Sequence, residues 1–214
     1  MNNFSDWEPT PQIEEDNSSV LLAIGDMMSG LLMIFALLFI TVSLQLSERS
    51  EPRRNVIEEL MNTFRANNVK IDLDEKTGVI TFKENILFPE NSAQLSDAGK
   101  STLRSFIPVY SNVILSNPEY QKEINRVVIE GHTSSSGTYN GNLQLSLLRS
   151  FAVAEYIFSP EMKFETQSQL SQKILASGRG EIEANPNIDD PNDRKVIFRL
   201  QFKGDDLSEV FMFK

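Results

Sequence analysis

The sequence predicts a single transmembrane helix followed by an α+β domain in which helices pack on one mixed sheet. A long apolar run from residue 20 to residue 46 supplies the transmembrane element. Beyond residue 68, strand-like alternation and helical periodicity follow one another in the order hairpin, helix, strand, helix, loop and strand. With 214 residues and 40% hydrophobic content, the chain can build one domain core besides the helix.

The apolar run is long enough to cross a membrane. As a helix, residues 20–46 would extend about 40 Å, whereas the hydrocarbon core of a bilayer is roughly 30 Å thick. Residues 1–19 hold no Lys or Arg, and no small-residue cleavage site follows the run, which is unlike a cleaved signal peptide. We therefore expect a permanent single-pass anchor, preceded by a flexible acidic tail over residues 1–19.

A polar linker is expected after the anchor. Residues 47–54 read SERSEPRR, and Pro52 predicts a break in the helix. The next segment has apolar residues at positions 56, 57, 60, 61 and 64, the spacing of an amphipathic helix. We expect the linker to occupy residues 47–68, the folded domain residues 69–203, and a tail residues 204–214.

The domain begins with a predicted hairpin over residues 69–82, with Gly78 in its turn. Ser96 is a candidate N-cap for a helix running to about Leu115, which Pro108 should kink or divide. A buried strand, a helix and a further short helix before a strand are predicted next. A long polar loop and a buried final strand complete the domain. These five segments cover residues 125–133, 143–158, 162–176, 177–195 and 195–202.

Composition excludes several classes of function. The net charge of −10 argues against a nucleic-acid partner, which requires a basic surface. The chain has no cysteine, which excludes a disulfide framework and thiolate metal sites. His132 is the only histidine, so we expect it to be structural and no metal to be bound. Since no catalytic carboxylate pair, phosphate loop or triad spacing stands out, we expect a protein that is not an enzyme and uses no cofactor.

One motif set in the domain is specific. Residues 130–153 read EGHTSSSGTYNGNLQLSLLRSFAV, in which ten residues separate Thr133-Ser134 from Leu145-Ser146, with Arg149 and Val153 following. This spacing resembles the signature of the OmpA-like peptidoglycan-binding family, and Asn142 falls where that family has its Asn. ILFPENSAQLSDAG, GRGE, Pro186 and Arg194-Lys195-Val196 resemble its other conserved segments. The resemblance covers about residues 70–203.

The resemblance implies a non-enzymatic site for the peptidoglycan stem peptide. Arginine binds carboxylates through a planar fork, so Arg149 and Arg194 are expected to hold a stem-peptide carboxylate. In the family an Asp at the position of Ser134 meets the amine of diaminopimelate, and the serine here alters that contact. The candidate residues are Thr133, Ser134, Tyr139, Asn140, Asn142, Leu145, Arg149 and Arg194. The alternatives are that Arg149 is a solvated helix residue, Arg194 a strand-edge charge, and residues 134–137 a simple turn.

Asp26 is a carboxylate inside the apolar run. A charge near the middle of a span costs roughly 2.5–3.5 kcal/mol on insertion scales, and such residues are functional by default. GDMMSGLLMIF around Asp26 resembles the transmembrane segment of MotB-type stator proteins, which implies that Asp26 carries H⁺ or Na⁺. Ser29 and Gly30 lie on the same helical stripe and would allow a partner helix to approach closely. The alternative is that Asp26 only pairs helices or snorkels to the interface.

Together the two resemblances imply a wall-anchored stator subunit of an ion-driven inner-membrane motor, and we expect the ion to be the proton. They require a cytoplasmic N-terminus and a periplasmic domain. Arg49, Arg53 and Arg54 oppose this topology under the positive-inside rule. The acidic N-terminus without Lys, the short linker and the stretch DMMSGLLMIF resemble the ZorB-type subunits of Zorya anti-phage systems.

That resemblance implies a homodimer inside a pentameric ring of a ZorA-like (MotA-like) multi-pass membrane protein, with peptidoglycan as a further partner. Two alternatives stay open. One is a flagellar MotB-type stator or a related transport energiser. The other is a passive peptidoglycan tether without ion flow.

Overall fold

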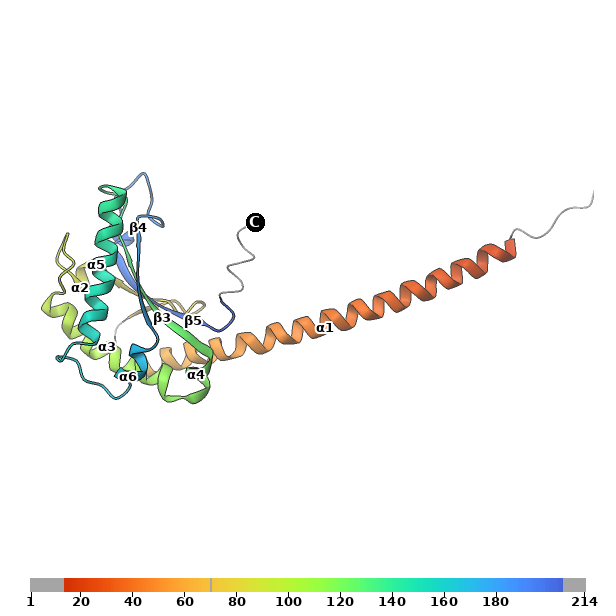
Figure 1. Ribbon diagram of the computed structural model, residues 1–214, viewed down its shortest axis with the longest axis horizontal. Helices are drawn as coiled ribbons and strands as arrows, with labels where there is room; N and C mark the ends of the chain where they lie inside the picture. The colour runs from red at the N-terminus through yellow and green to blue at the C-terminus, as the bar shows by residue number, and fades with distance from the viewer. Residues whose placement is uncertain (1–13, 70, 206–214) are drawn as a thin grey trace, which may run out of the picture. The chain divides into compact units, whose positions relative to one another are not determined.

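The computed structural model describes residues 14–69 and 71–205 (Figure 1). The chain divides into two compact units, Met1–Ser50 and Glu51–Lys214, which we describe separately. Helix α1 runs from Glu14 to Ala66, and its stretch Ser18–Leu44 is long and apolar enough to cross a membrane. The helix begins within the segment expected to be a flexible tail, and residues 1–13 and 206–214 lie outside the described residues.

The expected break at residues 47–54 is wrong, because α1 continues through Pro52. Proline removes one backbone hydrogen bond, but the following turns are held by tertiary packing. The amphipathic spacing predicted there is confirmed, since Val56, Leu60 and Phe64 are buried in the domain core. The second unit therefore starts at Glu51, and the segment assigned to a linker is a packed part of it.

A mixed sheet of five strands has the order β1-β2-β5-β3-β4. Only β3 and β4 run parallel; the other neighbouring strands are antiparallel. The expected hairpin is formed by β1 and β2, with Gly78 at a φ of +73° in its turn. The strands are β1 (Asp72–Leu73), β2 (Ile80–Lys83), β3 (Ile124–His132), β4 (Ile174–Gly180) and β5 (Lys195–Phe202).

The helices of the second unit largely follow the sequence. The Ser96 hydroxyl accepts a hydrogen bond from Gly99 N at 2.9 Å, as predicted for the N-cap of α3, and Pro108 does not divide that helix. Helix α5 starts earlier than expected because Thr138 caps it. The other described helices are short. The bounds are α2 (Glu84–Leu87), α3 (Asp97–Ser116), α4 (Pro118–Glu123), α5 (Tyr139–Ile157), α6 (Gln167–Ser171) and a 3-10 turn (Pro191–Asp193).

Strand β4 extends to Gly180, so the polar loop spans residues 181–194 and does not begin at residue 177 as expected. Parallel pairing with β3 supplies the backbone partners that hold this extension, for example Gly131 opposite Gly178. Both glycines allow α5 to approach the sheet closely, because a Cβ at either position would collide with Ser146. This close packing fixes the height of α5, and of its Arg149, above the sheet.

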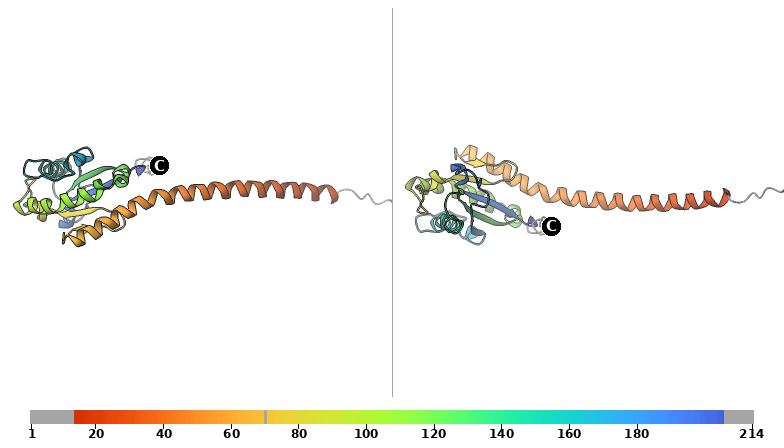
Figure 2. Two further views of the ribbon diagram at one scale, coloured as in Figure 1. Left: turned by 90° about the horizontal axis from the view of Figure 1, so that it is seen from below. Right: turned by 90° about the horizontal axis from the view of Figure 1, so that it is seen from above.

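An aromatic cluster forms the centre of the core. The ring centroid of Phe106 lies 5.0 Å from those of Phe82 and Tyr110, 5.2 Å from that of Phe198 and 5.6 Å from that of Phe64. These contacts join α3, two strands and the C-terminal turns of α1, which lie beside α3 (Figure 2). Rings arranged at these separations attract one another beyond simple burial.

Candidate functional site

The candidate site lies where the parallel strands β3 and β4 end. Thr133, which follows β3, donates its backbone N–H to Gly180 O at 2.9 Å, and this bond ties the two strand ends together. The Ser135 hydroxyl donates to Ile188 O at 3.4 Å, which holds the loop 181–194 against the β3–α5 turn. The β3–α5 turn, the end of β4 and the loop 181–194 thus meet at one end of the sheet.

A buried charge cluster connects these segments. Glu84 at the start of α2 accepts a hydrogen bond from Arg149 Nη2 and forms an ion pair with Arg194 Nε at 2.9 Å. Arg149 is 1% exposed, donates its Nε to Ser92 O at 3.0 Å, and places its guanidinium over the ring of Phe88. The alternative that Arg149 is a solvated helix residue is therefore wrong.

Arg194 precedes β5 and binds two carboxylates. Besides Glu84 it contacts Asp189 Oδ1 through Nη1 at 2.9 Å, and its side chain keeps 26% exposure. The same Nη1 lies 3.5 Å from Ser134 Oγ, which can accept a weak hydrogen bond. The cluster therefore alternates in charge from Arg149 through Glu84 and Arg194 to Asp189.

Burial lowers the pKa of the Arg149 guanidinium from its usual value, and the nearby Arg194 acts in the same direction. The carboxylate of Glu84 opposes both effects and favours the charged guanidinium. A buried arginine of this kind needs a counter-anion, so Glu84 is an integral part of the site.

Within the described part of the chain, the buried polar atoms of this region without a hydrogen-bond partner include Arg149 Nη1, Thr133 Oγ1 and both ring nitrogens of His132. Unpaired buried polar atoms are rare and destabilising, and a ligand oxygen would satisfy a guanidinium N–H or a hydroxyl. All four atoms are buried, so each leaves one hydrogen-bonding group of this region unused.

The remaining candidates lie around this cluster. Asn142 is buried near the start of α5 and donates its Nδ2 to Glu181 Oε2. Leu145 is half-buried, whereas Tyr139 and Asn140 are exposed. Among the described residues, no hydrogen bond or ion pair joins Tyr139 or Asn140 to Glu84 or its arginines.

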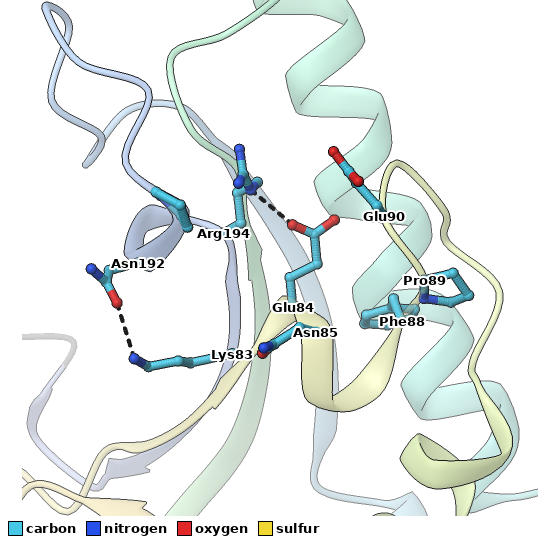
Figure 3. Close-up of a pocket in the computed structure, with 9 residues that line it drawn as sticks. Lys83, Glu84, Asn85, Phe88, Pro89, Glu90, Asn192 and Arg194 are labelled. Carbon is cyan, nitrogen blue, oxygen red and sulfur yellow. Dashed lines mark hydrogen bonds and ion pairs between the residues drawn. The ribbon is translucent and has the colours of Figure 1, made fainter.

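A pocket of about 520 Å³ opens beside Glu84 and Arg194 (Figure 3). Lys83 Nζ donates to Asn192 Oδ1 at 3.0 Å across it. The lining of the pocket combines charges of both signs with apolar surface. It is lined by Lys83, Glu84, Asn85, Phe88, Pro89, Glu90, Pro191, Asn192 and Arg194.

Sequence reasoning missed Glu84, Ser92 and Asp189. Glu84 carried a weak signal, because it is an acidic residue directly after a predicted strand and just before the apolar segment ILF. Its role becomes visible only when α5 and the start of β5 are brought against α2. His132, expected to be structural, is 1% exposed and lies 3.6 Å from Glu130 and 3.8 Å from Glu183.

Asp26 belongs to the first unit. Ser29 turns its hydroxyl back onto Gly25 O at 2.8 Å, so this polar group is satisfied within the helix. A Cβ added to Gly30 would meet nothing within 4 Å. Asp26, Ser29 and Gly30 recur at helical spacing and share one face of α1.

The chain is similar to two curated proteins named Zorya protein ZorB. One, from Escherichia coli strain Crooks, is 28% identical over 89% of this chain and 90% of the relative. The other, from Escherichia coli O139:H28, is 28% identical over 89% of this chain and 83% of the relative. The fold is shared with a crystal structure described as a MotB-like protein from Desulfovibrio vulgaris, which is 20% identical. That match has a TM-score of 0.52 and covers 74% of this chain and 96% of the other. The sequence profile of the OmpA family matches residues 87–197, more than half of the chain, and the chain therefore belongs to the OmpA family.

Proposed function

We propose that this protein is the wall-anchored stator subunit of an ion-driven inner-membrane motor that acts in anti-phage defence. The observation that carries the proposal is the presence, in one chain, of a carboxylate on a helix long and apolar enough to span a membrane and an OmpA-family domain in which Arg149 and Arg194 converge on Glu84. The similarity to ZorB proteins over most of the chain supports the defensive role over a flagellar one.

In this proposal the OmpA-family domain grips peptidoglycan through a carboxylate of the stem peptide. Arg149 and Arg194 supply the positive charge for this carboxylate, and Arg194, with 26% side-chain exposure, lines the adjoining pocket. Asn142 and the exposed Tyr139 and Asn140, all in the first turn of α5, would add contacts to the peptide. Charge-assisted hydrogen bonds from arginine to a carboxylate are roughly twice as strong as neutral ones, which favours this pairing for an anchor.

Asp26 is the ion carrier in this proposal. A carboxylate in hydrocarbon requires partner helices and access to water, and it binds and releases H⁺, or Na⁺, as that access alternates. Ser29 and Gly30 have small side chains on the same helix face as Asp26, so a partner helix can pack closely against it. The partner is a ZorA-like ring, pentameric around a dimer of this chain, and it turns while the wall holds the dimer.

The topology that this requires is N-terminus in the cytoplasm and second unit in the periplasm. Arg53 and the arginines near it oppose this orientation by the positive-inside rule. In the folded second unit Arg53 is paired with Asp205 at 3.0 Å and lies over the ring of Phe202, which offsets part of that charge.

The proposal is tested by phage plating on cells that carry the intact operon with either the wild-type chain or Asp26→Asn, at equal membrane levels. We expect Asp26→Asn to abolish protection. Met28→Leu, which changes a residue on the opposite side of α1, is the matched control and should protect normally. If Asp26→Asn still protects, the proposed motor function is wrong and the protein is a passive peptidoglycan tether. Absence of protection by the wild type, together with a swimming defect on deletion, would favour a flagellar stator.

A further inference from the structure

A second cavity, of about 660 Å³, lies on the face of the sheet that points away from the core. Side chains alternate between the two faces along a strand, and in β3 the core takes Val127 and Ile129, so Val128 and Glu130 point to the other face. The cavity shares no lining residue with the pocket beside Arg194. We call it the sheet groove, and it runs over residues 126–130 of β3, 175–179 of β4 and 199–201 of β5.

The sheet groove has an excess of positive charge. Five cationic and three acidic side chains line it, and each acid pairs with one arginine at 3.0–3.2 Å. The two cations left over are Lys76 and Arg126, both exposed, and neither forms an ion pair within the described residues. An occupant with two negative charges would therefore balance the groove. The pairs are Arg53–Asp205, Arg179–Glu183 and Arg199–Glu130.

The groove also has an apolar part. Val128 on β3 and Leu175 on β4 lie opposite each other in the register of the two strands, and both line the groove. Leu175 is 42% exposed, although an apolar side chain gains free energy when it is removed from water. An occupant that carries apolar side chains as well as acids would cover this part.

The chain itself leaves β5 at the sheet groove. Asp205 lines the groove, and its carboxylate accepts hydrogen bonds from Phe202 N at 2.8 Å and from Arg53 Nη2 at 3.0 Å, which fix the turn after the strand. Residues 206–214 follow, and nine residues can extend about 30 Å. Crossing from β5 over β3 to β4 takes only about 10 Å, so this segment is long enough to lie along the groove.

Residues 206–214, the C-terminal segment, match the groove in chemistry. They read DLSEVFMFK, with two acids, Asp206 and Glu209, near the start. Residues 210–213 are four consecutive apolar side chains, VFMF, which would lose free energy if left in water. The segment thus supplies the two negative charges and the apolar surface that the groove lacks.

We propose that the C-terminal segment docks in the sheet groove of its own chain. Its acids bind Lys76 and Arg126, and its apolar residues cover Val128 and Leu175. The docked segment closes the face of the sheet opposite to the one that α3 and α5 cover.

The test measures how fast a maleimide reacts with Ser177→Cys, a thiol in the sheet groove, in the purified full-length chain, which has no cysteine of its own. Phe211→Ser with Phe213→Ser should raise this rate about tenfold, because the segment loses most of its buried apolar surface and leaves the groove. Ser105→Cys, an exposed position on α3, is the matched control and should react at the same rate with either segment. An unchanged rate at Ser177→Cys would overturn the proposal.

The charges are tested by reversal. Lys76→Glu with Arg126→Glu should expose Ser177→Cys in the same way, because these glutamates repel the acids of the segment. Adding Asp206→Lys and Glu209→Lys should restore the slow reaction, which a packing defect in the groove would not allow. If the four reversals together leave the thiol as reactive as the first two, the charge pairing is wrong.

A cross-link identifies which chain supplies the segment. Ser177→Cys with Lys214→Cys, treated with a short bismaleimide, should give a linked product with the mass of one chain. A product with the mass of two chains would show that the segment of a second copy fills the groove and would overturn docking within one chain. If no product forms, while purified sacculi or a partner protein slow the labelling of Ser177→Cys, the groove belongs to that partner and the proposal is wrong.

Discussion

Arg149 on α5 and Glu84 on α2 form a buried ion pair, with side-chain exposures of 1% and 10%, between residues that lie 65 positions apart in the sequence. The pair joins the helix that carries the OmpA motif to the hairpin edge of the sheet. Because Glu84 also binds Arg194, it holds two cations of the candidate site in place.

Arg149→Ala should lower the free energy of unfolding by about 3 kcal/mol, the lower end for breaking a buried pair, because Glu84 keeps Arg194 as a partner. Urea titration of the full-length chain in detergent, followed by circular dichroism, measures this change. Arg179→Ala removes an exposed pair with Glu183 and should cost less than about 1 kcal/mol. Equal effects of the two substitutions would show that burial of the Arg149 pair carries no extra stability.

Acid should destabilise the second unit partly through Glu130. Burial acts to raise the pKa of this carboxyl, but His132 and Arg199 outweigh it, and the pKa lies below the usual value of 4.5. The unfolded chain therefore takes up the proton first as pH falls, so the contribution of Glu130 is complete above about pH 4.5 and is lost below it. Unfolding free energies measured at several pH values should show a shallower acid slope for Glu130→Gln. An unchanged slope would assign the acid sensitivity to other carboxylates.

Long, strongly patterned elements were predictable from the sequence, and contacts between distant segments were not. The strand Lys195–Phe202 was predicted with its observed bounds, because its apolar residues are nearly continuous. The N-cap at Ser96 was also predictable, because a helix cap depends on residues close in the sequence, here Ser96 and Gly99. Glu84 was missed because α2 is a single turn without periodicity, and its partners come from two other segments. The helix through Pro52 was missed because packing of Val56 and Leu60 overrides a local preference.

Gly131→Ala should shift α5 away from the sheet. The added Cβ would collide with the backbone carbonyl of Ser146, which is part of the helix and cannot rotate away. Overpacking of this kind costs about 1–3 kcal/mol, and here it also displaces Arg149 from Glu84. We expect a lower melting temperature and weaker binding to isolated sacculi. Gly25→Ala, where a Cβ meets nothing within 4 Å, is the control for stability. Normal binding by Gly131→Ala would show that the site tolerates movement of α5.

Gly30→Leu should disrupt assembly without affecting the folding of the chain itself. A Cβ at this position meets nothing within 4 Å, so we expect the penalty of a larger side chain to come from a partner helix. We expect Gly30→Leu to lose co-purification with the ZorA-like ring and to lose phage protection, and Gly30→Ala to retain both. Met28→Leu serves again as the control on the opposite face. Full assembly of Gly30→Leu would place the partner helices elsewhere on α1.

The absence of cysteine from the chain allows its topology to be tested directly. Ser116→Cys introduces a thiol at an exposed position at the end of α3, and Asn2→Cys introduces one before the membrane span. With a membrane-impermeant maleimide on spheroplasts, we expect Ser116→Cys to react at once and Asn2→Cys to react only after lysis. The reverse pattern would place the OmpA-family domain in the cytoplasm, as Arg49, Arg53 and Arg54 would by charge alone. Peptidoglycan could not then be its ligand, so this labelling decides between the charge rule and the wall-binding site.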